Sequence, residues 1–462
     1  MKPLCKLFLD WDRMDNYSFL ILILIGLPVF LAVYRLIPVK GQRAALIVGS
    51  FLCLLIYDGF SAKSVLFMLA STLINYGFLS IQTRIKNKNK RKSFIWFVSL
   101  FNVAILVLAK LLGAGILGIS FYTFTVIALQ IDMYKSREYL SLAEHMSFLM
   151  AYPKLMMGPI ARLDEFRESM DKLDHEHGLN AKNLENGLKT FIIGLSMKVL
   201  LADQLYTMWY SICVSGITGL HFSTAWLGSY AYMLELYLDF WGYSLIAIGL
   251  GEMLGLTIPV NFNDPYVSKT VAEFWRRWHV SLGQWFRDYV YIPLGGSRKG
   301  PFSTIVNLLI VWALTGIWHG MGISFMCWGM MLGLIIIIEK FTPLGRLQNT
   351  KVIGHIYIVL LMPITWMIFA HTDAKEMFGY LGCMFGLYPA GATPAKAQFF
   401  RYLMDYWYLL LIGIALLTPY PAKLYRKVKD SLWSLPVFVA LFWLCIYILY
   451  SSSSNPFLYM AF

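Results

Sequence analysis

Long apolar runs separated by short charged segments dominate the chain. Runs such as Phe19 to Ile37, Val352 to Phe369 and Tyr406 to Leu417 carry few or no charges, and several approach the roughly 20 residues that a helix needs to cross the hydrocarbon core. Helices are predicted at 17–37, 42–58, 64–83, 94–112, 115–133, 188–201, 206–212, 226–240, 243–256, 305–314, 325–338, 352–370, 402–419 and 434–450. The pattern predicts an all-α, polytopic membrane protein with about 10–12 transmembrane or re-entrant helices.

The charged segments between these runs are basic and predict the topology. Arg84 to Lys92 is the densest basic loop, and Lys423 to Lys429 is another. Basic loops favour the cytoplasm, which places both the N-terminus and the C-terminus outside. The first apolar run lacks a small-residue cleavage site, so it is expected to stay as a membrane helix.

Between Ser141 and Lys189 the apolarity weakens. Two prolines break Tyr152 to Ile160, which predicts a re-entrant or interfacial segment that lines a protein cavity. Arg162 to Asn183 then has the charge of a cytosolic amphipathic connection. His175 and His177 lie in it without a further cluster of ligands, so no metal site is predicted.

Composition supports the membrane assignment and narrows the partners. Hydrophobic residues make up 58% and charged residues 14% of the 462 residues, against about 45–50% and about 25% in soluble proteins. The net charge of +13 lies in short loops, where it fits topology and anionic lipid head groups rather than nucleic acid. The six cysteines have no metal-ligand or redox spacing.

Two carboxylates fall within the apolar sequence. Glu235 and Asp239 are four residues apart and therefore share a helix face. Intramembrane carboxylates usually face a bundle interior or a water-filled cavity. They are expected either to line a reaction chamber or to form a buried structural pair.

The most unusual chemistry lies between Glu273 and His319, where two histidines bracket a basic, aromatic segment. If Glu273 to Phe286 is helical, Trp278 and His279 fall on its apolar face. Apolar sequence flanks His319, and Gly316 and Gly320 allow a ligand or backbone to approach closely. A buried imidazole that stays neutral can accept a proton, as general-base catalysis requires. His279 taken alone is more typical of a structural histidine.

Several ordered motifs in this region match a known family. They are Tyr152-Pro153-Lys154, Gly158-Pro159-Ile160, Tyr237 to Ser244, Asn261 to Tyr266, Glu273 to Leu282, Trp285 to Gly296, and Trp318-His319-Gly320. The sequence resembles the bacterial branch of the membrane-bound O-acyltransferases, which includes the alginate O-acetyltransferase membrane subunit and the D-alanyl-teichoic acid membrane transferase. The resemblance is dense over 152–320, and one membrane-embedded domain over 1–462 is expected.

The resemblance implies a helical bundle around a central tunnel, with a thioester donor entering from the cytosol and an acceptor hydroxyl from the other face. By the matching motifs His319 is the principal catalytic histidine and His279 the second. The tunnel is expected to be lined by Glu235, Asp239, Asn261, Trp278 and Trp318. Family members often carry an acid after the Tyr-Ser of Tyr243-Ser244, but this chain has Leu245, so no role transfers to that position.

Transfer of an acyl group to an alcohol needs a base, a dry passage and stabilisation of the developing oxyanion. His319 is the predicted base, and Asn261, Asn263, Trp278 and Trp318 are the candidate oxyanion donors. Donor phosphates are predicted to bind Arg276, Arg277, Arg298 and Lys299, whose alternative role is to set topology.

The sequence thus predicts an O-acetyltransferase of the bacterial plasma membrane. Acetyl-CoA is the expected donor substrate, no bound cofactor or metal is expected, and an extracytoplasmic polysaccharide is the acceptor. The chain carries no soluble Ser-His-Asp domain that could finish transfer to a polymer, and the family resemblance implies a separate extracytoplasmic esterase-like partner. Two alternatives remain: transfer of D-alanine from a carrier protein, or a transporter or flippase that uses Glu235 and Asp239.

Overall fold

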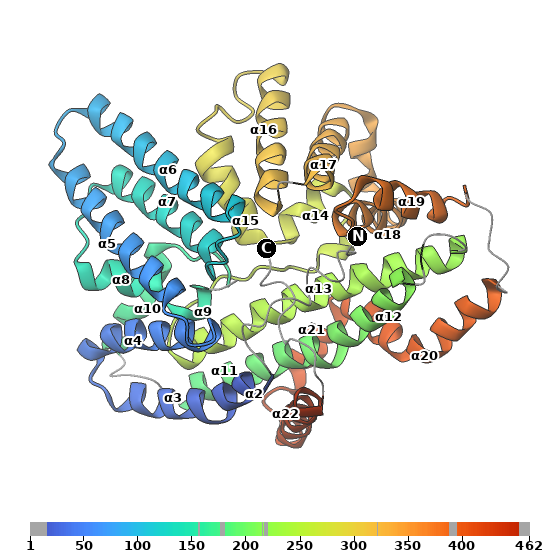
Figure 1. Cartoon of the computed structure of the whole chain (residues 1–462), viewed down its shortest axis with the longest axis horizontal. Helices are drawn as coiled ribbons and strands as arrows, with labels where there is room; N and C mark the ends of the chain where they lie inside the picture. Colours follow the sequence, from blue (N-terminus) through green and yellow to red (C-terminus); the bar gives the residue numbers. More distant parts are fainter. Residues whose placement is uncertain are drawn as a thin grey trace.

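Helices form nearly all of the regular structure, as the computed structural model shows (Figure 1). It describes residues 16–155, 158–175, 181–214, 216, 220–320, 322–387 and 395–451. The N-terminal half contains α2 (Asn16–Ile21), η1 (Leu22–Gly26), α3 (Leu27–Leu36), α4 (Val39–Tyr57), α5 (Lys63–Arg84), α6 (Lys88–Leu111), α7 (Ile119–Ser136), α8 (Leu142–Met150), α9 (Tyr152–Leu155), α10 (Leu163–His175), α11 (Ala181–Ser196), η2 (Met197–Ala202) and α12 (Asp203–Val214).

The C-terminal half contains α13 (Phe222–Met253), η3 (Pro265–Val267), α14 (Val271–Arg277), α15 (Val280–Phe286), η4 (Arg287–Tyr291), α16 (Pro301–His319), α17 (Ile323–Phe341), η5 (Pro343–Asn349), α18 (Ile353–Ala370), α19 (Ala374–Met384), α20 (Ala395–Leu416), α21 (Tyr420–Val428) and α22 (Ser434–Ser451). The described part of the chain has no strand, only one isolated β-bridge between Phe262 and Trp278.

Membrane-spanning helices are as numerous as the apolar pattern predicts. Within the described residues, 10 helices are long and apolar enough to cross a bilayer, and the apolar helix Gly41–Tyr57 is shorter. The all-α, polytopic fold class is therefore confirmed. The prediction of separate helices at 226–240 and 243–256 is wrong, because α13 runs unbroken over 32 residues. Gly242 does not interrupt it, since neighbouring residues keep the helical hydrogen bonds.

The long helix α13 forms the centre of the bundle, where it crosses α11 closely. A Cβ added to Gly194 would lie 2.5 Å from the carbonyl oxygen of Gly242, so only glycine permits this crossing. Helices in lipid associate through such small-residue contacts because burial of apolar surface contributes little there. The α11–α13 pair thus supplies a rigid frame behind the candidate site.

The helices α16 and α17 form a second close pair. A Cβ on Gly316 would lie 2.6 Å from the carbonyl oxygen of Phe325, and one on Gly329 would lie 2.4 Å from that of Trp312. The close approach predicted for Gly316 is therefore that of a neighbouring helix backbone. This packing places His319, the last residue of α16, beside the turn that connects the two helices.

The segment after Ser141 folds as short helices rather than as one span. The α9 turn ends at Leu155, and α10 follows from Leu163, as expected for a sequence broken by prolines. His177 lies outside the described residues, and His175 ends α10.

Candidate active site

His279 lies at a break between two short helices. One continuous helix over Glu273 to Phe286 is a wrong prediction: α14 ends at Arg277, and α15 begins at Val280. Trp278 is extended and pairs with Phe262 across the β-bridge, while His279 adopts φ 46° and ψ 54°. Such left-handed backbone costs a non-glycine residue about 1–2 kcal/mol, and strain of this kind concentrates at functional sites.

Asn261 holds the break in place. Its backbone oxygen accepts from Val280 N at 2.9 Å, and its side-chain Oδ1 accepts from Ser281 N at 3.2 Å and from Ser281 Oγ at 2.8 Å. The same Oδ1 lies 3.2 Å from His279 Nδ1. An oxygen can only accept, so His279 Nδ1 carries the hydrogen and Nε2 is left as the acceptor. Within the described part of the chain, no protein group bonds Nε2, so this nitrogen is the one left to accept a proton.

His319 lies in an aromatic enclosure at the end of α16. Its ring centroid lies 4.4 Å from that of Trp318, 5.2 Å from that of Trp328 and 5.0 Å from that of Phe369. Trp318 also approaches His279, with ring centroids 6.3 Å apart, so one indole lies against both histidines. His319 is 9% exposed and His279 is 4% exposed, which keeps both imidazoles away from bulk water.

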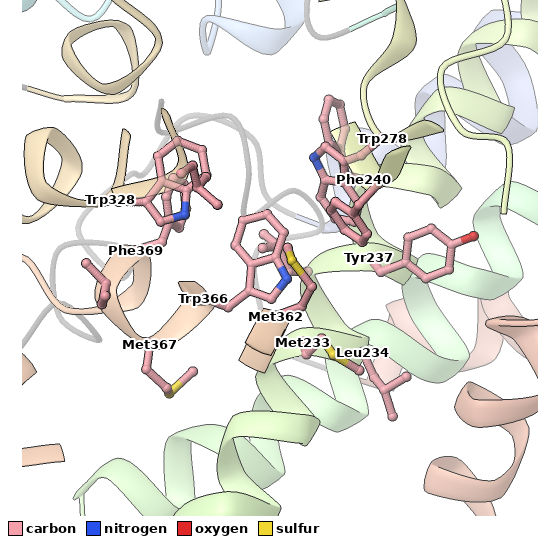
Figure 2. Close-up of a cluster of buried hydrophobic side chains, with 14 of the residues drawn as sticks. Met233, Leu234, Tyr237, Phe240, Trp278, Trp328, Met362, Trp366, Met367 and Phe369 are labelled. Carbon is pink, nitrogen blue, oxygen red and sulfur yellow. The ribbon is translucent and has the colours of Figure 1, made fainter. Parts of the chain in front are cut away.

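Both histidines line one cavity of about 890 Å³. Aromatic side chains form much of its wall, including Trp275, Trp278, Trp312, Trp328, Trp366 and Phe369. Figure 2 shows Trp366 between Trp278 and Trp328, and its ring centroid lies 5.0 Å and 6.0 Å from theirs. The cavity is therefore largely apolar where the histidines lie, as a reaction that must exclude water requires.

The opposite end of the cavity is basic. Four cations from three stretches of the chain line it: Arg276 of α14, Arg287 of η4, and Lys340 near the end of α17 with Arg346 of η5. His319 is the last and Pro301 the first residue of α16, so they lie about 27 Å apart along the helix. The helices α16 and α17 thus place His319 at one end of the cavity and the four cations at the other end, which we call the mouth.

Glu339 fixes the geometry of this mouth. Its carboxylate accepts from Val271 N at 2.6 Å and from Ala272 N at 2.9 Å, at the first turn of α14. A carboxylate at a helix N-terminus satisfies free N–H groups and complements the helix dipole. The end of α17 is thereby joined to the helix that carries Arg276.

The predicted site residues divide between the cavity and its surroundings. The cavity is lined by His319, His279, Trp278 and Arg276. Asn261 and Trp318 do not line it, but Asn261 contacts His279 and Trp318 packs against His319. Arg277 is held by Glu273 at 3.0 Å, and Arg298 and Lys299 are exposed in the turn before α16; none of these three is in the lining.

Glu235 and Asp239 lie away from this cavity. Asp239 forms an ion pair with Lys198 at 2.7 Å, and Lys198 forms a second one with Asp203 at 2.6 Å. The lysine comes from the π-helical turn η2, whose wider winding directs it toward α13. Asp239 is thus paired with Lys198 and not with Glu235, whose Oε2 has no hydrogen-bond partner among the described residues.

Sequence reasoning missed several residues of the site. Arg287, Lys340 and Arg346 carry ordinary loop charges, and only the fold shows that they share a mouth with Arg276. Lys110 was also missed: its Nζ donates to the carbonyl oxygen of Trp318 and lies 5.7 Å from the Trp318 ring centroid. In the sequence, the only sign of a role for Lys110 is its position as a basic residue near the end of the predicted helix 94–112.

Several buried donors close to the histidines lack a protein acceptor. Within the described part of the chain these are Trp318 Nε1, Trp328 Nε1 and Asn261 Nδ2. Buried polar groups are normally hydrogen-bonded, so such donors indicate a site for a ligand oxygen. No group of three or more potential metal-ligating side chains occurs among the described residues.

The comparisons with known proteins match this geometry. A model of the membrane-bound O-acyltransferase family matches residues 51–380, which include both histidines and most of the cavity. The chain belongs to the membrane-bound O-acyltransferase family. It is therefore an acyltransferase, and the resemblance carried by the motifs between Tyr152 and Gly320 is confirmed.

Relatives within this family act on different polymers. A probable alginate O-acetylase of Pseudomonas fluorescens is 32% identical over 385 residues, which cover 80% of this chain and 75% of the relative. A peptidoglycan O-acetyltransferase of Helicobacter pylori is 30% identical over 301 residues, covering 59% and 57%. A teichoic acid D-alanyltransferase of Streptococcus thermophilus is 29% identical over 243 residues, covering 48% and 56%.

Proposed function

We propose that this membrane-bound O-acyltransferase moves an acetyl group from a cytosolic thioester, acetyl-CoA, across the membrane toward hydroxyls of an extracytoplasmic polysaccharide. The observation that carries the proposal is one cavity with a basic mouth and two buried histidines at its apolar end. The names of the alginate and peptidoglycan O-acetyltransferase relatives favour acetyl as the group and a polysaccharide as the acceptor.

In the proposed reaction His319 accepts the proton of the acceptor hydroxyl. The hydroxyl oxygen attacks the thioester carbonyl carbon, the new C–O bond forms, and the C–S bond breaks. The thiolate leaves and takes up the proton held by His319, so CoA departs as the free thiol and the imidazole is neutral again. Trp328 packs against His319 and lines the cavity, so its Nε1 is suited to donate to the oxyanion, and the aromatic wall keeps water away.

The mouth is suited to the phosphates of the donor. Arg276, Arg287, Lys340 and Arg346 present cationic groups at the end of the cavity far from His319. Arginine and lysine bind phosphate through charge-assisted hydrogen bonds. A nucleotide held there would direct its thioester arm along the apolar wall toward the histidines.

Removal of the mouth charges should weaken donor binding. Arg276→Ala, Lys340→Ala and Arg346→Ala are each expected to raise the KM for acetyl-CoA about three- to tenfold with a smaller change in kcat, because they lose one contact to phosphate. Steady-state kinetics at low and high salt measures this effect, which should shrink as salt screens the charges.

The matched control is the double variant Arg298→Ala/Lys299→Ala, which removes two exposed cations outside the cavity lining. It should leave the KM nearly unchanged. An equal rise in KM for the control and the mouth variants would mean that general surface charge, rather than this mouth, attracts the donor.

Asn261 is proposed as a positioning residue for His279. Asn261→Ala removes the acceptor of three contacts, so we expect kcat to fall at least tenfold, KM to change little, and the thermal stability to decrease. Asn261→Asp keeps an acceptor oxygen and should recover part of the activity. Asn263→Ala is the control, because this neighbouring side chain is exposed; equal losses from Asn261→Ala and Asn263→Ala would contradict the role.

The orientation of the chain follows the basic loops. We propose a bacterial plasma membrane with the mouth facing the cytoplasm, where acetyl-CoA is available, and both termini outside. We also propose a separate extracytoplasmic, esterase-like protein that completes transfer to the polymer. Co-purification from membranes tests this partnership, which would be contradicted if the chain alone acetylated the polymer at the cellular rate.

D-Alanine transfer is the second candidate, and the teichoic acid D-alanyltransferase relative favours it. The two candidates differ in their donor. Purified chain in proteoliposomes should release CoA from acetyl-CoA in the presence of an acceptor, and should not use a D-alanyl carrier protein. Activity with the charged carrier alone would replace the acetyl proposal with the alanyl one.

A further inference from the structure

A second large cavity lies apart from the histidines, between α3, α11 and α22. It has a volume of about 880 Å³ and shares no lining residue with the catalytic cavity. Near Ile23 the wall is closed, since α2 and η1 pack against α11 and α22 in one buried cluster. Further along, α3 has no extensive packing against α11 or α22, which leaves a groove.

The groove is polar at one end only. Helix α3 ends where α11 and α22 begin, so Arg35, Glu185, Lys189 and Asp430 lie together at this end. The walls are otherwise apolar and include Leu27, Leu31, Ile192, Leu435, Val439 and Phe442. This is the polarity pattern of an amphiphile with a charged head and a hydrocarbon tail.

The depth of the groove matches one leaflet of a bilayer. Ile23 precedes Arg35 by 12 residues, which corresponds to about 18 Å along the helix. Trp443 follows Ser434 by nine residues, or about 13 Å. Half of a hydrocarbon core of about 30 Å is similar, so an acyl chain that enters at the polar end would end near the closed wall.

The charges at the polar end favour a zwitterionic head group. Lys189 pairs with Glu185 at 2.5 Å and donates to the Lys429 carbonyl oxygen at 2.6 Å. Its ammonium group is therefore already neutralised by a carboxylate of the same groove end. Arg35 and Asp430 have no ion-pair partner among the described residues, and both line the groove. One open cation and one open anion match a phosphate and an ammonium group.

We propose that this groove binds one phospholipid with an ethanolamine head group. The lipid lies in the cytoplasmic leaflet if the basic segment Lys423 to Lys429 faces the cytoplasm, as the proposed orientation has it. Its phosphate lies against Arg35, its ammonium against Asp430, and an acyl chain fills the groove between α3 and α22. The lipid completes the packing that α3 lacks. The site is independent of the acyl-transfer proposal, because it stands apart from the catalytic cavity.

The test is to measure lipids retained by the purified full-length protein, by native mass spectrometry and by lipid extraction, after exchange with phosphatidylethanolamine or phosphatidylglycerol. Wild type should retain about one phosphatidylethanolamine per chain. Ala32→Trp, which fills the groove, and Arg35→Ala/Asp430→Asn, which removes the head-group contacts, should each lower binding about tenfold or more.

The controls are Val29→Trp on the exposed side of the same helix segment and Lys423→Ala on the same membrane side, neither of which lines the groove. Both should retain the lipid. The proposal is overturned if wild type retains no phospholipid, if phosphatidylglycerol binds equally well, or if both groove variants bind lipid as wild type does. The charge variant keeps the test valid if Ala32→Trp fails to fold.

Discussion

His319→Ala should abolish acetyl transfer while the protein remains inserted in the membrane. Loss of a general base typically costs about 10²- to 10⁴-fold in rate, and here no other side chain in the aromatic enclosure is placed to replace the imidazole. Transfer of label from acetyl-CoA to polymer measures the loss. The KM for acetyl-CoA should change little, because the basic mouth lies at the other end of the cavity.

The control for His319→Ala is a cavity variant of the same α16–α17 pair that keeps the base. Thr315→Ala removes a hydroxyl that lines the cavity and bonds the Val311 carbonyl oxygen at 2.8 Å, so it should retain most of the activity. The assignment would be wrong if purified His319→Ala kept near-wild-type turnover. Equal inactivation by Thr315→Ala would indicate damaged packing rather than a missing base.

His279→Asn should lower kcat severely, by about 10²-fold or more. His279 lines the cavity, its Nδ1 is held by Asn261, and its Nε2 has no protein partner among the described residues, so a substitution removes an acceptor from a fixed position. Asparagine is chosen because it tolerates the left-handed backbone that His279 adopts at φ 46°, which alanine or valine would strain further. Single-turnover kinetics with saturating acetyl-CoA measures the chemical step.

A structural role for His279 predicts a different outcome. In that case His279→Asn would lower the thermal stability and weaken substrate binding. The kcat per folded molecule would stay close to that of wild type. Thermal unfolding in detergent, measured beside the kinetics, separates the two. A stable variant with nearly full kcat would restrict the catalytic role to His319.

Hydropathy predicted most spanning helices of this chain because apolar side chains in lipid must form helices about 20 residues long. It divided α13 at Gly242, since a glycine looks like a break. In the structure Gly242 instead lets α11 approach, because a Cβ added to it would lie only 2.8 Å from the carbonyl oxygen of Gly194. The use of a glycine for packing depends on a partner helix that local sequence does not reveal.

The sequence predicted the parts of the candidate site that lie in family motifs. It did not predict the parts that depend on contacts between distant segments. The motifs with His279 and His319 matched the family, and both line the cavity. The break depends on Phe262, 16 positions before Trp278, and on Asn261, 18 positions before His279, so periodicity over 273–286 predicted a helix instead. The basic mouth combines three distant segments, and loop charges alone do not show which of them converge.

The sidedness of donor use tests the central claim most directly. Membrane vesicles from cells that make this protein and its polymer can be prepared inside-out or right-side-out, and each is supplied with labelled acetyl-CoA. The account predicts base-labile label on the polymer from inside-out vesicles, which expose the mouth with Arg276 and Lys340, and none from right-side-out vesicles. Equal labelling from both kinds of intact vesicle, or labelling that persists with His319→Ala, would contradict it.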